Sequence, residues 1–188
     1  MIILAGFWLS VLFFVLVLLW ILVPALYGLP PVPTNRDRIH HALQLANLQP
    51  GETIYDLGAG DGRVLLIAAR DFNAKAVGIE IGPMQCILIR LRIMTGGLGS
   101  QIKIHWGNFY KANLKDADVV FVYATSKEVT KLAPHLGAQM KSGSRLSSIS
   151  ADISDWEPVL VDDHDLIFIY EMPPTPGSVT TYMLKKAK

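Results

Sequence analysis

This sequence has little cysteine and little net charge, and charged residues of either sign are scarce near its N-terminus. Among its 188 residues there is one cysteine, Cys86, which excludes an intrachain disulfide framework and a multi-cysteine zinc site. With 17 basic and 16 acidic residues the net charge is +1, so a large nucleic-acid footprint has no support and no nucleic-acid partner is expected. The histidines show no metal-ligand spacing apart from the adjacent His40 and His41, so no metal site is predicted.

No acidic, basic or histidine residue occurs before Arg36. Residues 1–23 are almost entirely Leu, Val, Ile, Phe and Trp, and as a helix they would span roughly 34 Å, enough to cross a bilayer core. A secretory signal peptide, the alternative, would have basic residues before a shorter apolar run. The segment therefore predicts a single-pass anchor, and Arg36 and Arg38 place the remainder on the cytoplasmic or equivalent side of the membrane.

Three segments follow from this composition. Residues 1–23 are the expected transmembrane anchor, and residues 24–34 are a proline-rich linker, stiff because each proline fixes φ. Residues 35–188 have ordinary globular composition and are long enough to bury one core.

Within residues 35–188, strand patterns alternate with helix patterns. The expected helices are 35–48, 63–72, 84–94 and 126–141, and the expected strands are 53–57, 74–81, 101–106, 118–123, 144–150, 166–171 and 179–185. Such alternation predicts a doubly wound, Rossmann-like α/β fold with a seven-stranded, mostly parallel sheet. Residues 172–178 leave no room for a helix, so the last two strands are predicted to form a C-terminal antiparallel hairpin.

A glycine-rich turn follows the first expected strand, in the sequence Asp56-Leu57-Gly58-Ala59-Gly60-Asp61-Gly62-Arg63. In an open α/β sheet this turn lies at the carboxyl ends of the strands, where ligands bind. Its spacing, G-x-G-x-G, differs from the dinucleotide fingerprint, which makes a nicotinamide cofactor the weaker alternative. Asp56 and Asp61 would repel a pyrophosphate and suit a positively charged ligand. Glu80 ends the next strand, where a carboxylate can accept both hydroxyls of a ribose.

These motifs, together with Gly107-Asn108-Phe109 after the third strand, resemble those of class I S-adenosylmethionine-dependent methyltransferases. The resemblance implies that Asp56 contacts the methionine end of the cofactor, that Glu80 holds its ribose and that Asn108 reaches the adenine amine. It implies S-adenosyl-L-methionine as the cofactor and a binding site made by Asp56, Gly58, Ala59, Gly60, Gly62, Glu80, Ile81, Asn108 and Phe109.

A narrower resemblance rests on Pro31-Val32-Pro33-Thr34, on residues 51–63 and on Asp155-Trp156-Glu157-Pro158. These segments are similar to those of the membrane-anchored protein-lysine methyltransferases that modify the ATP synthase c-subunit or the adenine nucleotide translocase, and of their prokaryotic relatives. The resemblance implies lysine N-methylation by in-line transfer, with the lipid bilayer and a protein in or near it as partners.

Two residues are candidates for the catalytic side of the site. Lysine has a pKa of about 10.4, so its amine must be desolvated or deprotonated before it can attack. Tyr123, at the end of the fourth strand, can orient an amine through its hydroxyl or ring. Asp152 can accept a proton or attract a cationic lysine, although a solvated loop acid is the plainer interpretation. Trp156 is interpreted as core.

Two alternatives to a lysine methyltransferase stay open. The sequence Tyr123-Ala124-Thr125-Ser126 is not the Asn/Asp-Pro-Pro-Tyr motif of methyltransferases that act on adenine or glutamine, which lowers the rank of those substrates. A membrane-dissolved small molecule as substrate is one alternative. The other is a noncatalytic cofactor-binding scaffold at the membrane.

Overall fold

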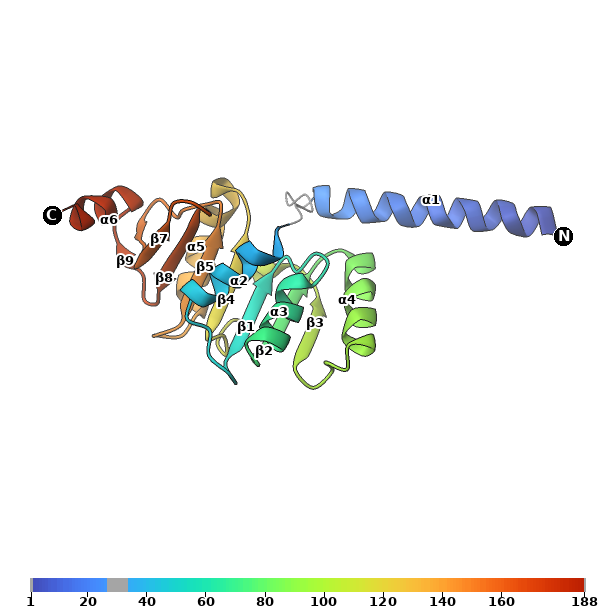
Figure 1. Cartoon of the computed structure of the whole chain (residues 1–188). Coiled ribbons are helices and arrows are strands. Elements are labelled where there is room, and N and C mark those ends of the chain that lie inside the picture. Colours follow the sequence, from blue (N-terminus) through green and yellow to red (C-terminus); the bar gives the residue numbers. More distant parts are fainter. Residues whose placement is uncertain (1, 27–33, 188) are drawn as a thin grey trace.

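The computed structural model describes residues 2–26 and 34–187 (Figure 1). Residues 27–33, which make up most of the expected proline-rich linker, lie outside the described residues. The expected linker boundary and its stiffness therefore stay predictions.

The first helix, α1 (Ile2–Leu26), covers the expected anchor and continues past Val23 through Pro24. Its side chains are described at residues 4–19 and 22, and most of these are exposed. Over the described residues alone, no helix is both long enough and apolar enough to cross a bilayer. The anchor stays a prediction.

A seven-stranded sheet has the strand order β3-β2-β1-β4-β5-β8-β7. Strands β1 to β5 are parallel to one another, and β8 runs antiparallel to both β5 and β7. The expected Rossmann-like, mostly parallel sheet is thus confirmed. The strands are β1 (Thr53–Leu57), β2 (Lys75–Glu80), β3 (Ile102–Trp106), β4 (Val119–Tyr123), β5 (Arg145–Ile149), β7 (Leu160–Asp162) and β8 (Ile167–Glu171).

Helices cover both faces of this sheet (Figure 1). One core contains apolar residues of α2 (Arg36–Leu45), α3 (Arg63–Asp71) and α4 (Pro83–Thr95). The other contains residues of α5 (Ser126–Gln139) and of the short η1 (Phe109–Lys111). Strand β4 shows how a buried strand serves both cores, because Val119 and Phe121 point into the first and Val120 and Val122 into the second.

The C-terminal hairpin is where the sequence prediction is wrong. Residues Val179–Lys186 form a helix, α6, and the antiparallel hairpin consists of β7 and β8. The β-branched residues at the start of this segment favour a strand locally. Ser178 instead caps a helix by accepting a hydrogen bond from the Thr181 N–H at 3.3 Å, and no residue of α6 is buried in a sheet. Strand β7 was missed because it has three residues.

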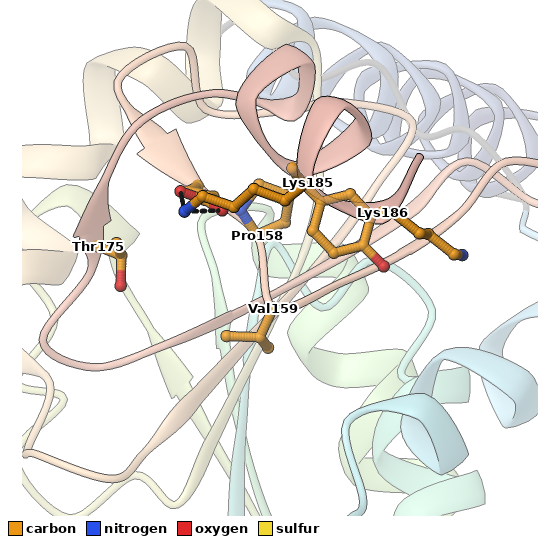
Figure 2. A pocket seen from close by; sticks show the side chains of 7 residues that line it. Pro158, Val159, Thr175, Lys185 and Lys186 are labelled. Carbon is orange, nitrogen blue, oxygen red and sulfur yellow. Dashed lines mark hydrogen bonds and ion pairs between the residues drawn. The ribbon is translucent and has the colours of Figure 1, made fainter. Parts of the chain in front are cut away.

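Helix α6 packs beside a two-stranded sheet made by β6 (Trp156–Glu157) and β9 (Thr175–Pro176). Between them is a pocket of about 510 Å³ (Figure 2), with the Lys185 ammonium 2.8 Å from both carboxylate oxygens of Glu157. None of the predicted site residues lines this pocket, which is lined by Glu157, Pro158, Val159, Thr175, Tyr182, Lys185 and Lys186.

Candidate functional site

The carboxyl ends of the parallel strands bring most of the predicted site residues to one edge of the sheet. Leu57 at the end of β1 is in register with Ile79 of β2 and Val122 of β4, and Glu80 is in register with Trp106. The glycine turn, Glu80, Asn108 and Tyr123 each lie at or just beyond one of these strand ends.

The glycine turn adopts a backbone that L-residues with side chains avoid. Gly58, Gly60 and Gly62 have φ values of 91°, 56° and 79°. At Gly62 there is a second requirement, because an added Cβ would lie 2.8 Å from Cγ1 of Ile89. Glycine therefore lets α3 begin close against α4, at the place where a ligand would meet the turn.

Glu80 holds this turn in place. Its side chain is buried, Oε2 accepts a hydrogen bond from the Gly60 N–H at 2.7 Å, and Oε1 accepts one from the Gly82 N–H at 2.7 Å. Burial raises the pKa of Glu80, although the backbone hydrogen bonds oppose that shift. Each carboxylate oxygen keeps a second lone pair, which leaves capacity to accept a hydroxyl.

The carboxyl group of Asp56 is buried, and no cation or hydrogen-bond donor among the described residues offsets that burial. Asp56 is 3% exposed, and burial raises the pKa of its carboxyl group to about 8, with the carboxylates of Glu80 and Asp61 adding to the shift. Among the described residues no side chain or backbone N–H donates a hydrogen bond to this carboxyl group. A buried carboxyl group without a partner can pair with a cationic group of a ligand or accept a hydrogen bond from it.

Asp61 differs from Asp56 because two arginines neutralise it. Its Oδ1 lies 2.9 Å from Nε of Arg63, and its Oδ2 lies 3.0 Å from Nη1 of Arg92. These partners overcome partial burial and lower the pKa of Asp61 to about 2. Its charge therefore ties α3 to α4, whereas the sequence suggested that it serves a ligand. Arg63 also donates from Nη1 to the Thr34 carbonyl at 2.5 Å.

The loop after β3 is attached to the end of β2. The Gly107 N–H donates to the Glu80 carbonyl at 2.9 Å, and Nε1 of Trp106 donates to the Ile81 carbonyl at 2.9 Å. Asn108 uses its side-chain oxygen to cap η1, accepting from the Tyr110 N–H at 2.9 Å, and Phe109 is buried. The structure thus brings Asn108, Phe109 and Ile81 to the edge that holds Glu80. The cap occupies one lone pair of the Asn108 oxygen.

The predicted catalytic residue Tyr123 has a partner that sequence reasoning missed. The guanidinium carbon of Arg38, on α2, lies 5.7 Å from the centroid of its ring. Arg38 also donates to the Asp165 carbonyl and, from Nη2, to Oγ of Ser150 at 2.9 Å. Because the stacking joins positions far apart in the chain, no local motif signals it.

Asp152 lies in the loop after β5, beyond the Ile149 that is in register with Tyr123. Its carboxylate contributes to the raised pKa of buried Tyr170, about 12, of which burial is the larger cause. The hydroxyl of Tyr170 accepts a hydrogen bond from the Ile153 N–H at 2.9 Å, which fixes this loop. Trp156 packs edge-on against Tyr170 at 5.9 Å, in agreement with its interpretation as core.

A second polar cluster was not predicted. His41 on α2 places Nε2 3.3 Å from Asp162 and Nδ1 3.1 Å from Asp165, both in the β7–β8 hairpin region. The three side chains are close enough to share a metal ion. Sequence spacing could not reveal the group because its members come from distant segments.

Comparison with known proteins identifies the family of this chain. A family model described as the ANTKMT methyltransferase domain matches residues 56–160, a range that begins at Asp56 and includes Glu80, Asn108 and Tyr123. The chain belongs to this family. Methyltransferases of the ANTKMT family are S-adenosylmethionine-dependent enzymes, and the expected cofactor is thereby confirmed.

Relatives of this ANTKMT-family chain include lysine methyltransferases. It is 32% identical over 148 residues to a protein-lysine N-methyltransferase of Saccharolobus islandicus, a match that covers 75% of this chain and 92% of the relative. It is 28% identical over 152 residues to the adenine nucleotide translocase lysine N-methyltransferase of Mus musculus, with coverage of 80% and 66%. These matches confirm the predicted family of protein-lysine methyltransferases.

Among solved structures, an RNA methyltransferase from Salinibacter ruber in complex with S-adenosyl-L-homocysteine superposes with a TM-score of 0.73. The identity is 31%, and the match covers 76% of this chain and 94% of that one. A geranyl diphosphate methyltransferase at 15% identity and a TM-score of 0.55 shares the fold.

Proposed function

We propose that this methyltransferase transfers a methyl group from S-adenosylmethionine to a lysine side chain of a protein in or beside a membrane. The observation that carries the proposal is Asp56, a buried carboxyl group without a hydrogen-bond partner among the described residues, next to a glycine turn held by Glu80. The lysine substrate is supported by the relatives from Saccharolobus islandicus and Mus musculus.

The residues present fit the cofactor. Asp56 would accept the ammonium group of its methionine end, because a cation compensates a buried carboxylate. The free lone pairs of Glu80 would accept the ribose hydroxyls, and Asn108 would meet the adenine amine. When bound, S-adenosylmethionine supplies a methyl group already activated by its sulfonium. The chain's own task is therefore to align an incoming amine and to remove its proton.

On the substrate side, Tyr123 and Arg38 favour the neutral form of the incoming lysine amine. The ring of Tyr123 offers an apolar surface at the strand end, and the Arg38 guanidinium lies 5.7 Å from its centroid. A nearby cation disfavours a second cation, so Arg38 lowers the pKa of a lysine that enters beside it. We assign proton acceptance to the Asp152 carboxylate, from which the proton passes to solvent.

We further propose that α1 anchors the enzyme in a membrane. The support is its composition, since the helix Ile2–Leu26 has neither acidic residues in its first turn nor basic residues in its last, and no charged residue between. Confinement to a bilayer raises the effective concentration of substrates in that bilayer. A domain that barely exceeds the methyltransferase fold can obtain selectivity from such confinement.

The test uses the full chain purified in detergent and supplied with isotope-labelled S-adenosylmethionine and membranes. A lysine methyltransferase puts the label on protein, and acid hydrolysis yields methyl-lysine. Tyr123→Ala abolishes transfer while binding of S-adenosylhomocysteine is retained, and Tyr123→Phe, which keeps the ring, is the matched control. Asp152→Asn lowers turnover without weakening cofactor binding.

Other outcomes would contradict the proposal in distinguishable ways. Label in the organic extract indicates a membrane-dissolved small molecule, and nuclease-sensitive label indicates RNA. Cofactor binding without transfer to any fraction indicates a noncatalytic scaffold.

A further inference from the structure

Helix α4 exposes an apolar stripe that the methyltransferase fold does not use. Ile87, Leu91 and Met94 are 47%, 49% and 70% exposed, and their spacing places them along one side of the helix. The opposite side is already apolar, because Cys86, Ile89 and Ile93 are buried in the core. A helix that is apolar on both sides is expected where its outer side meets something other than water.

Trp106 extends this stripe at the start of α4. It ends the edge strand β3, it is 68% exposed, and its Nε1–H donates to the carbonyl of Ile81, two residues before α4 begins. Because the ring's one polar group is satisfied inside the protein, the exposed part of the ring is hydrocarbon. Tryptophan in such a position is typical of the membrane interface. We call Ile87, Leu91, Met94 and Trp106 the α4 face.

Helix α4 carries charges of one sign, because it contains Arg90 and Arg92 and no acidic residue. Arg92 is engaged with Asp61, whereas Arg90 is exposed. Apolar side chains beside an exposed cation suit a surface that binds anionic lipid headgroups.

The α4 face is also next to the segment that we propose enters the membrane. Helix α1 contacts α4, and α4 is the outermost helix at that end of the domain (Figure 1). A bilayer that receives α1 is therefore within reach of α4.

We infer that the α4 face lies on the bilayer, with its apolar side chains at the boundary between headgroups and acyl chains and with Arg90 at the lipid phosphates. This inference rests on the proposed membrane anchoring. It orients the enzyme, because Glu80 and Trp106 bond to residues 82 and 81, immediately before α4, and end neighbouring strands at the edge of the sheet that we propose binds the cofactor. We call this edge the cofactor edge. The cofactor edge then opens beside the membrane surface, where a lysine at the end of a membrane helix would lie.

The test places a fluorescent probe on the α4 face of the full chain. Leu91→Cys and the matched control Val159→Cys, 49% and 52% exposed in the wild type, are each labelled with an environment-sensitive dye. The wild type serves as the blank because Cys86 is buried. Both are reconstituted into vesicles of phosphatidylcholine and phosphatidylglycerol that contain a nitroxide lipid, and S-adenosylhomocysteine binding is measured on the same samples.

We expect the probe at residue 91 to shift to shorter wavelength and to be quenched several-fold more strongly than the probe at residue 159. Vesicle flotation of both proteins with residue 91 unquenched would overturn the inference and leave the anchor standing. If neither protein floats with the vesicles, both the anchor and the inference are overturned. S-adenosylhomocysteine binding retained in the same samples would leave the proposed methyltransferase function standing. The probe at residue 91 could instead respond to the protein-to-lipid ratio and not to the nitroxide lipid. That result would assign the α4 face to a second copy of the chain and overturn the inference.

Discussion

The carboxylate of Glu80 accepts a hydrogen bond from the N–H of Gly60 at 2.7 Å, across from the strand that ends in the glycine turn. The residue expected to hold a ribose therefore already holds the backbone of the glycine turn. The second oxygen is fixed by Gly82 at 2.7 Å, so the carboxylate has one orientation before any ligand arrives. Such preorganisation reduces the conformational entropy lost on binding.

Glu80→Gln is expected to weaken S-adenosylhomocysteine binding at least about tenfold and to lower stability by about 1–3 kcal/mol. An amide offers one acceptor oxygen, so its NH2 group would face the N–H of either Gly60 or Gly82. Calorimetric titration and thermal unfolding measure the two effects. Glu171→Gln, at an exposed position on β8, is the control. Unchanged affinity in the Glu80 variant would remove Glu80 from the cofactor site.

Cofactor affinity is expected to rise between pH 6 and pH 8. The pKa of Asp56 in the free protein is about 8, so at lower pH its carboxyl group must lose a proton to pair with the ligand's ammonium. The affinity then changes by at most about tenfold per pH unit, or about 1.4 kcal/mol. Titrations in buffers of different ionisation enthalpy would detect the released proton. Asp56→Asn should bind weakly with no such slope, and a slope that persists in this variant would assign the proton to another group.

The same group makes stability fall as pH rises. The unfolded Asp56 ionises near pH 4, whereas the folded one keeps its proton to about pH 8, so folding takes up a proton in that window and becomes less favourable with increasing pH. Asp56→Asn should therefore match the wild type near pH 4 and exceed it by at least about 1 kcal/mol near pH 7.5. Chemical denaturation at both pH values measures the difference. A variant less stable than the wild type at pH 7.5 would contradict the raised pKa.

Gly62→Ala is expected to destabilise the domain by about 1–3 kcal/mol. The φ of 79° is unfavourable for alanine, and the new Cβ would meet Ile89 at 2.8 Å. Gly99→Ala is the control, because nothing lies within 4 Å of a Cβ added there and its φ is not in the left-handed range. Equal melting temperatures for the two variants would show that the turn does not require glycine at residue 62.

Two adjacent serines in β5 form a matched pair. Oγ of Ser147 is buried with no hydrogen-bond partner among the described residues, while Oγ of Ser148 donates to the Ala151 carbonyl at 2.6 Å. Ser147→Ala should be neutral or stabilising by up to about 1 kcal/mol, and Ser148→Ala should destabilise by about 1 kcal/mol or more. Denaturant unfolding compares them. The reverse order would indicate a partner for Ser147 that these contacts do not include.

Local chemistry made much of the fold predictable. Strand β1 lies at its expected bounds, Asn35 caps α2 at the expected start of that helix, and the glycine turn opens α3 at Arg63. Each depends on residues close together in the chain, such as a buried strand that runs into glycines. The strand predicted over residues 179–185 was wrong for the same reason, because local β-propensity is weak evidence where a serine caps a helix and no residue is buried.

The gathering of the candidate site residues at one edge of the sheet was predictable where a sequence motif specifies it, and not where it depends on packing. The order and spacing of Asp56, Glu80 and Asn108 along the chain predicted that they lie at neighbouring strand ends. The neutralisation of Asp61 by Arg92, and the stacking of Arg38 on Tyr123, depend on how separate elements meet in three dimensions. The raised pKa of Asp56 likewise depends on burial, which no single residue in the sequence specifies.

The hydrogen bond from Arg63 to the Thr34 carbonyl determines how far the enzyme can reach. It joins the first described residue after α1 to the end of the glycine turn, so the chain enters the domain at the cofactor edge. Between Leu26 and Thr34 a fully extended chain spans no more than roughly 28 Å. If α1 is held in place, the cofactor edge therefore stays within that distance of its end. A target lysine that lies farther from the end of α1 than this distance plus the length of its own side chain cannot be methylated. Lengthening residues 27–33 would widen the range of target lysines without altering a single contact in the site.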